Sequence, residues 1–141
     1  GPRIEEDWPC IDEESGKPLI ALSIDDVPAT FEKFDPSDIE ACLKLLEEHG
    51  AKATLFVMAR ELEKHPASVS ASLVNAVSKG FELGNHDLLD VKTVRKSGDE
   101  LRSALCECDE AIQSLVERAG GKWRSWRDFS GSGGSSSSGG G

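Results

Sequence analysis

The stretch LIALSIDDVPATF, residues 19–31, decides the fold of this chain because it joins an apolar run to two neighbouring aspartates. Residues 18–24 are nearly continuous in apolar side chains, which is typical of a strand buried on both faces of a parallel sheet. Asp25 and Asp26 follow where that strand would end, although two adjacent carboxylates repel each other. A bound divalent cation would relieve this repulsion, whereas a solvated turn or a helix N-cap is the simpler alternative.

Strand and helix patterns alternate along the rest of the chain. Asp35 and Pro36 predict the start of a helix that ends before Gly50, and the capping box Ser97-x-x-Glu100 predicts the start of a long helix. Further strands are predicted from ATLFVM (53–58), FELGNH (81–86) and the start of KWRSW (122–126), with a helix over 66–79. This order predicts an α/β fold with a parallel sheet and right-handed crossovers.

Polar side chains stand at two of the predicted strand ends. In open parallel sheets the ligand site lies at the carboxyl ends of the strands, so Asp25 and Asp26 should meet Asn85 and His86 there. In GNHDLLD, residues 84–90, His86 and Asp90 are four apart, and one helical turn would aim both the same way. With Asp26 they would form a three-ligand site suited to zinc, with Asp25 as candidate general base.

The composition limits the classes of partner. The chain carries 26 acidic and 16 basic residues, a net charge of −10, which disfavours general binding to nucleic acid. Neither a membrane span nor a signal peptide is visible. Because the chain begins with Gly1-Pro2, we interpret its N-terminus as incomplete, and a secreted or a cytoplasmic location both stay open.

The chain divides into three parts by composition. Residues 1–17 form an acidic N-terminal extension, residues 18–129 hold the single domain, and residues 130–141 contain only Ser and Gly, as in a disordered tail. The four cysteines, Cys10, Cys42, Cys106 and Cys108, are interpreted as buried or bystander thiols. His49 and His65 are interpreted as a helix-end cation and a loop residue.

Three segments resemble the NodB-type polysaccharide deacetylases. LSIDDVP resembles the first motif of this family, HGAKATLFVM resembles the segment that follows it, and KGFELGNHDLLD resembles the second motif. The resemblance runs from about Leu19 to Asp90, and KWRSWRDFSGSG extends it more weakly. It implies an incomplete (β/α) barrel made of the first three or four β/α units.

The resemblance also implies roles for single residues. Asp25 corresponds to the general base, Asp26 to the aspartate metal ligand and His86 to the first histidine ligand. Asp90 stands where the family has the second histidine ligand, four residues after the first. Two alternatives are that Asp87 is the ligand instead, or that no metal binds. The implied cofactor is a divalent ion, zinc by family, with the carboxylate-rich set shifting the preference towards Mn or Mg.

The third family motif has an arginine that orients the catalytic aspartate. Arg127 is the best match and Arg124 the second, but the proline expected after the arginine is absent, and the late histidine that acts as general acid has no counterpart. The implied function is metal-dependent hydrolysis of N-acetyl groups on oligo- or polysaccharides.

Two other functions stay open, together with one expectation about assembly. The first is a truncated, inactive relative, or pseudoenzyme, that binds metal or carbohydrate. The second is a receiver-like signalling domain with Asp87 as phosphoacceptor, which would lack a fifth strand and leave His86 without a role. An incomplete barrel would also expose a sheet edge, through which copies of the chain could associate.

Overall fold

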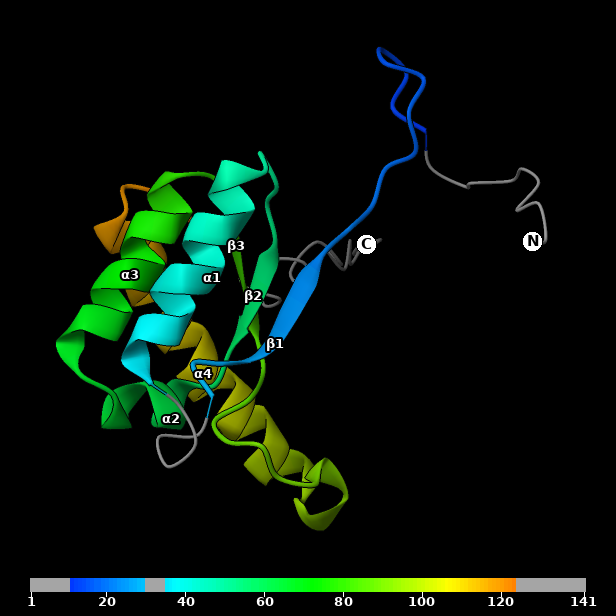
Figure 1. The fold of residues 1–141 in the computed structure, drawn as a ribbon. Helices are drawn as coiled ribbons and strands as arrows, with labels where there is room; N and C mark the ends of the chain where they lie inside the picture. The colour runs from blue at the N-terminus through cyan, green and yellow to red at the C-terminus, as the bar shows by residue number, and fades with distance from the viewer. Residues whose placement is uncertain (1–10, 30–34, 124–141) are drawn as a thin grey trace, which may run out of the picture.

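A computed structural model describes residues 11–29 and 35–123 of the chain. It contains a three-stranded sheet with helices packed against it (Figure 1). The elements in chain order are β1 (Ser23–Val27), α1 (Pro36–Glu48), β2 (Thr54–Val57), α2 (Ala59–Lys64), α3 (Ala67–Ser78), β3 (Glu82–Asn85), the 3-10 turn η1 (Thr93–Arg95) and α4 (Gly98–Arg118).

The sheet has the predicted parallel topology. Its strand order is β1-β2-β3, and both neighbouring pairs run parallel. The connections contain α1 between the first two strands, and α2 with α3 between the second and third. α1 and α3 lie side by side on one face of the sheet (Figure 1). The carboxyl ends of the three strands therefore lie at one edge, where the polar residues were expected to meet.

β1 contains a bulge at the two aspartates. Ile24 pairs with Leu55 and Val27 pairs with Val57, so two residues of β1 lie opposite one residue of β2. Residues three apart in a regular strand point to opposite faces. The extra residue returns Val27 to the face of Ile24, and both therefore reach the same hydrophobic core.

The bounds and burial predicted for the first strand were wrong. β1 begins at Ser23 and includes Asp25 and Asp26, which were expected to follow the strand. Leu19 and Ile20 are 57% and 79% exposed. The reason is that β2 begins at Thr54, the partner of Ser23, so the residues before Leu22 extend beyond the sheet as an arm without a neighbouring strand (Figure 1).

The helices bury the apolar faces that the sequence pattern indicated. Ile39 and Leu43 of α1 are buried in the core. α3 buries Val69, Leu73 and Ala76. Together, α1 and α3 cover the β2 residues Leu55 and Val57, whose side chains are 1% and 0% exposed.

The capping box at the start of α4 is confirmed. The Ser97 hydroxyl accepts a hydrogen bond from the Glu100 amide at 3.2 Å, and the Glu100 carboxylate accepts one from the Ser97 amide at 2.7 Å. Further along α4 the core face is more polar than predicted: Asp109 is buried and accepts a hydrogen bond from the indole Nε1 of Trp123 at 2.8 Å. Leu101 and Leu105, at the start of the predicted stripe, are only half-buried.

Two short elements were not predicted, and one prediction lies largely outside the described residues. α2 has six residues and η1 three, too few to show a periodic pattern. Lys122 and Trp123 do not form a strand, and the remainder of the predicted fourth strand, 124–126, lies beyond the described ranges.

Cys42, Cys106 and Cys108 are free thiols. Burial raises the pKa of the Cys108 thiol to about 11, and its Sγ lies 3.3 Å from the carbonyl oxygen of Val57. Cys108 is thus a neutral core residue, as interpreted, whereas Cys10 lies outside the described residues.

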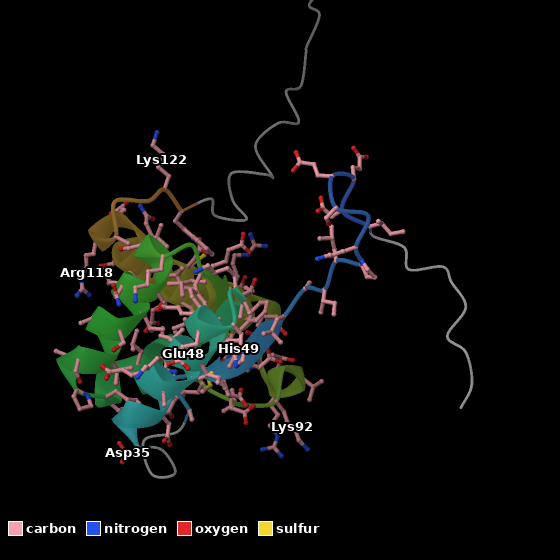
Figure 2. The ribbon with its side chains drawn as sticks, turned by 45° about the horizontal axis from the view of Figure 1, so that its top comes forward. Asp35, Glu48, His49, Lys92, Arg118 and Lys122 are labelled. Atoms are coloured by element: carbon pink, nitrogen blue, oxygen red, sulfur yellow. The ribbon has the colours of Figure 1, made fainter. Side chains whose placement is uncertain are left out.

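Apart from Glu61, Asp87 and Asp109, the Asp, Glu, Lys and Arg side chains of the described residues lie at least partly at the surface. Lys92, Arg118 and Lys122 project outward from different sides of the molecule (Figure 2). Among the helices of the described residues, none combines the length and the apolar character that a membrane crossing requires.

Gly84 in β3 gives a test of packing between β2 and β3. It pairs in register with Phe56, and a Cβ at Gly84 would lie 2.5 Å from two ring atoms of Phe56. We expect Gly84→Ala to lower the free energy of unfolding by about 1–3 kcal/mol, because the ring must move away from the sheet. Urea denaturation followed by circular dichroism measures the change.

Gly98→Ala is the matched control, since a Cβ at Gly98 has open space around it within a helix. This control should leave stability unchanged or raise it slightly. Equal unfolding midpoints for Gly84→Ala and the parent chain would show that Phe56 does not pack on the glycine.

Candidate active site at the strand ends

Asp26 and His86 meet at the edge of the sheet. The His86 Nε2 atom lies 3.0 Å from Asp26 Oδ1, with the two side chains 27% and 53% exposed, respectively. Asp26 comes from the bulge in β1, and His86 directly follows β3. The His86 amide donates to the Val57 carbonyl at 3.0 Å, which anchors this residue to β2. The structure therefore brings together two residues that are sixty positions apart.

Backbone strain is concentrated at the same place. Within the described residues, the non-glycine residues with positive φ are Asp26 at 56° and Asp87 at 72°. A left-handed conformation costs a residue with a side chain about 1–2 kcal/mol, although aspartate tolerates it better than most residues. Strained residues that persist in a fold tend to mark functional sites. One of these two contacts His86, and the other follows it directly in the chain.

Asp25 lies beside Asp26 with an exposed side chain. Both aspartates border a small hollow of about 150 Å³, whose other walls are mainly apolar and come from β1, α1 and β2, including Ile24, Ile39 and Leu43. Asp25 can therefore reach solvent next to the Asp26–His86 pair. This is a position that a general base requires.

The segment after His86 does not form the expected helical turn. Residues 86–92 form an irregular bend, because Asp87 adopts a left-handed conformation. The Asp87 side chain is buried and forms an ion pair with Lys96, whereas Asp90 is exposed. In the part of the chain that the structure describes, no three His, Cys, Asp or Glu side chains gather to hold a metal. The ligand set of Asp26, His86 and Asp90 stays a prediction.

The Asp26–His86 pair fits a divalent ion as two ligands. Carboxylate oxygen and imidazole nitrogen are both usual zinc ligands, and two ligands on one tetrahedral zinc lie about 3.3 Å apart. The Nδ1 atom of His86 is buried and has no hydrogen-bond partner within the described residues. The donor types and the 3.0 Å separation thus agree with a shared ion.

The other predicted or considered site residues do not join this pair. Arg127 and Arg124 lie outside the described residues, so their expected role stays a prediction. His65 is buried at the end of α2, where its Nε2 lies 2.9 Å from the Ala29 carbonyl oxygen. His49 follows α1 at the surface, near Glu48 (Figure 2).

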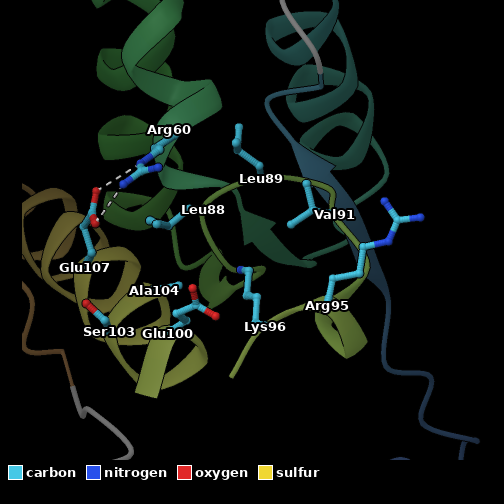
Figure 3. A pocket seen from close by; sticks show the side chains of 10 residues that line it. All are labelled: Arg60, Leu88, Leu89, Val91, Arg95, Lys96, Glu100, Ser103, Ala104 and Glu107. Carbon is cyan, nitrogen blue, oxygen red and sulfur yellow. Dashed lines mark hydrogen bonds and ion pairs between the residues drawn. The ribbon is translucent and has the colours of Figure 1, made fainter. Parts of the chain in front are cut away.

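A larger pocket, of about 460 Å³, lies between α2, α4 and the segment that joins β3 to α4 (Figure 3). Arg60 of α2 and Glu107 of α4 form an ion pair across it at 3.4 Å, and Lys96 points into it. Sequence reasoning missed Lys96 and its ion pair with Asp87. Lys96 gives no signal because it stands in a polar loop, nine residues from Asp87.

A family model for polysaccharide deacetylases matches residues 12–134 of the chain. A peptidoglycan-N-acetylglucosamine deacetylase from Bacillus cereus is 27% identical over 100 residues, which are 71% of this chain and 33% of that enzyme. The chain therefore spans about one third of the length of this relative.

Solved structures resemble the described fold. A family 4 acetyl xylan esterase from Clostridium thermocellum, solved in complex with a cobalt ion, is 26% identical with a TM-score of 0.56, covering 72% of this chain and 44% of that one. A mutant of a carbohydrate esterase family 4 pseudoenzyme with restored enzymatic activity is 25% identical with a TM-score of 0.54, covering 70% and 33%.

These matches agree with the parallel three-stranded fold and cover only part of each relative. The family model covers far more than half of the chain. The chain therefore belongs to the polysaccharide deacetylase family, of whose barrel it contains the first β/α units.

Proposed function

We propose that this chain contributes the metal-binding half of a deacetylase site that hydrolyses N-acetyl groups on carbohydrates. The observation that carries this proposal is the 3.0 Å approach of His86 to Asp26 beside the exposed Asp25. The substrate class follows from the family and from the peptidoglycan and xylan enzymes that the chain resembles.

Asp26 and His86 would hold the ion, with Asp90 as the third ligand if the bend after His86 brings it near. A bound divalent ion, zinc in the first place and Mn or Mg as alternatives, would polarise the amide carbonyl. Asp25 would accept the proton of the attacking water, and Arg127 would orient Asp25. The amide C–N bond then breaks, acetate leaves, and the sugar amine takes up a proton.

An inactive, metal- or sugar-binding relative is the second candidate. One observation favours it: the described residues contain no group of three possible metal ligands. One of the structures that it resembles is described as a pseudoenzyme. Acetate release from N-acetylated chitooligosaccharides by the chain with added metal would support the first candidate and contradict the second.

The first prediction from this site concerns the division of roles between the paired aspartates. We expect Asp26→Asn and His86→Ala to abolish zinc binding in calorimetric titration, because each removes a ligand. Asp25→Asn should bind zinc like the parent chain and abolish any acetate release, because it removes only the base.

Asp99→Asn and His49→Ala are the matched controls, since both residues are exposed and neither takes part in the Asp26–His86 contact. They should bind zinc like the parent chain. Loss of zinc in Asp25→Asn with retention in Asp26→Asn would show that the two roles are reversed.

The third ligand can be tested by restoring the histidine of the family motif. We expect Asp90→His to raise zinc affinity several-fold, because zinc favours imidazole nitrogen over another carboxylate. The same change should weaken any binding of magnesium, which prefers oxygen. Unchanged affinities for both ions would exclude Asp90 from the site.

We also propose that copies of the chain associate through the exposed edge beside β1. Ile20 is 79% exposed in the arm before that strand, and Leu22 is 42% exposed. An edge strand with apolar neighbours is a template for pairing with another chain.

We expect the parent chain to sediment above its monomer mass, and Ile20→Lys to shift it towards monomer. Val94→Lys is the matched control, because Val94 is 88% exposed in η1, outside β1 and the arm before it. A monomeric parent chain at all concentrations, or equal effects of both substitutions, would contradict association through this edge.

A further inference from the structure

Both carboxylate oxygens of Asp87, the residue after His86, interact with other groups of the protein. Its side chain is 10% exposed, and Oδ1 accepts a hydrogen bond from the Leu88 amide at 2.7 Å. Oδ2 forms a close ion pair with Nζ of Lys96, whose side chain is 18% exposed. Both carboxylate oxygens are thus directed to internal partners. This arrangement argues against Asp87 as the missing metal ligand.

Hydrogen bonds also hold the backbone on each side of His86. The Asp87 amide donates to Asn85 Oδ1 at 2.9 Å, and Asn85 Nδ2 donates to the Leu105 carbonyl of α4 at 2.9 Å. The first amides of α2 reach the same segment: Ala59 donates to the Asp87 carbonyl at 3.3 Å, and Arg60 to the Leu88 carbonyl at 3.0 Å. His86 therefore stands between two residues that are anchored to α2 and α4.

Lys96 lies at the other end of the loop that starts with Asp87, residues 87–96. It stands just before the N-cap Ser97, so its bond to Asp87 ties the two ends of the segment 87–96 together. Removing one partner of a partly buried ion pair leaves the other charge without compensation. The Asp87 carboxylate would then turn towards water, and since Asp87 is already strained at φ 72°, the turn would shift His86 with it.

We propose that the Asp87–Lys96 ion pair positions His86 against Asp26, with Lys96 acting as a positioning residue on the side of the loop opposite the site. The metal part of this inference rests on the proposed function, but the orientation of the His86 ring does not. Lys96 and its neighbour Arg95 both line the pocket between α2 and α4, and the Arg95 guanidinium extends to the side far from Arg60 and Glu107 (Figure 3).

The test uses the full chain with Lys96→Met, which keeps most of the aliphatic stem and removes the charge. We expect zinc affinity to fall about tenfold, the size typical for loss of a group that orients a metal-bound histidine. Lys96→Arg keeps the charge and should restore affinity to near that of the parent chain. Arg95→Met is the matched control and should bind zinc like the parent chain.

A second readout needs no metal. Long-range nitrogen–proton spectra of the histidine rings at fixed pH report which nitrogen of His86 carries the proton. With Asp26 accepting from Nε2, the parent chain should show the Nε2–H tautomer, and Lys96→Met should show a mixture. Asp87→Asn should move the same signals in the same direction, and it replaces Lys96→Met should that variant fail to fold.

The results distinguish the proposed metal binding by His86 from the proposed positioning of His86 by the Asp87–Lys96 ion pair. A parent chain that binds no zinc but loses its single His86 tautomer in Lys96→Met would contradict the metal role and support the positioning role. Zinc affinity and His86 ring signals that stay as in the parent chain, in a folded Lys96→Met or Asp87→Asn chain, would overturn the positioning role whatever the chain does with substrate.

Discussion

The parallel pairing of β1 with β2 imposes a constraint on which both the core and the candidate site depend. Ile24 and Val27 must both face the helices to bury their side chains, yet they are three residues apart. One extra residue resolves this conflict, and it is placed where Asp26 turns into a left-handed conformation. The irregularity that completes the core therefore also directs a carboxylate towards the neighbouring strand end.

A second aspartate with a left-handed backbone follows the end of β3. Asp87 is also left-handed, and it is held there by the hydrogen bond that its amide donates to Asn85 Oδ1 and by the ion pair with Lys96. Strain of this kind persists only where surrounding interactions offset it. Of the two strained aspartates, Asp26 contacts His86 and Asp87 directly follows His86 in the chain. The backbone strain is therefore concentrated where these two side chains meet.

The candidate site is open to solvent in the described residues. Asp26 remains 53% exposed in the described residues, and water screens the interaction between charges at such a position. Electrostatic stabilisation in an active site is strongest where water is excluded. The three described strands can thus bring donors together, but a deacetylase of full strength would need further walls around them. This is the physical basis for keeping an inactive binding module as the second candidate.

The sequence by itself determined the order of the three parallel strands and of α1, α3 and α4, the capping box of α4, and the meeting of Asp26 with His86. These features depend on local periodicity and on a general rule for parallel sheets, so neighbouring residues carry the information. The sequence could not show that Asp25 and Asp26 lie within β1, because a bulge depends on which residues of β2 stand opposite. The prediction that Leu19 and Ile20 lie in a buried strand was wrong, since apolar character does not reveal whether a neighbouring strand reaches them.

Only the tertiary structure decided the conformation after His86. The four-residue spacing to Asp90 suggested a helical turn, but Asp87 found partners at Leu88 and Lys96, and the chain bends there instead. Lys96 is nine residues away in the sequence, in a loop without a periodic pattern. Contacts between such positions are fixed by the packing of α2 and α4 around the loop, and this packing depends on the whole fold.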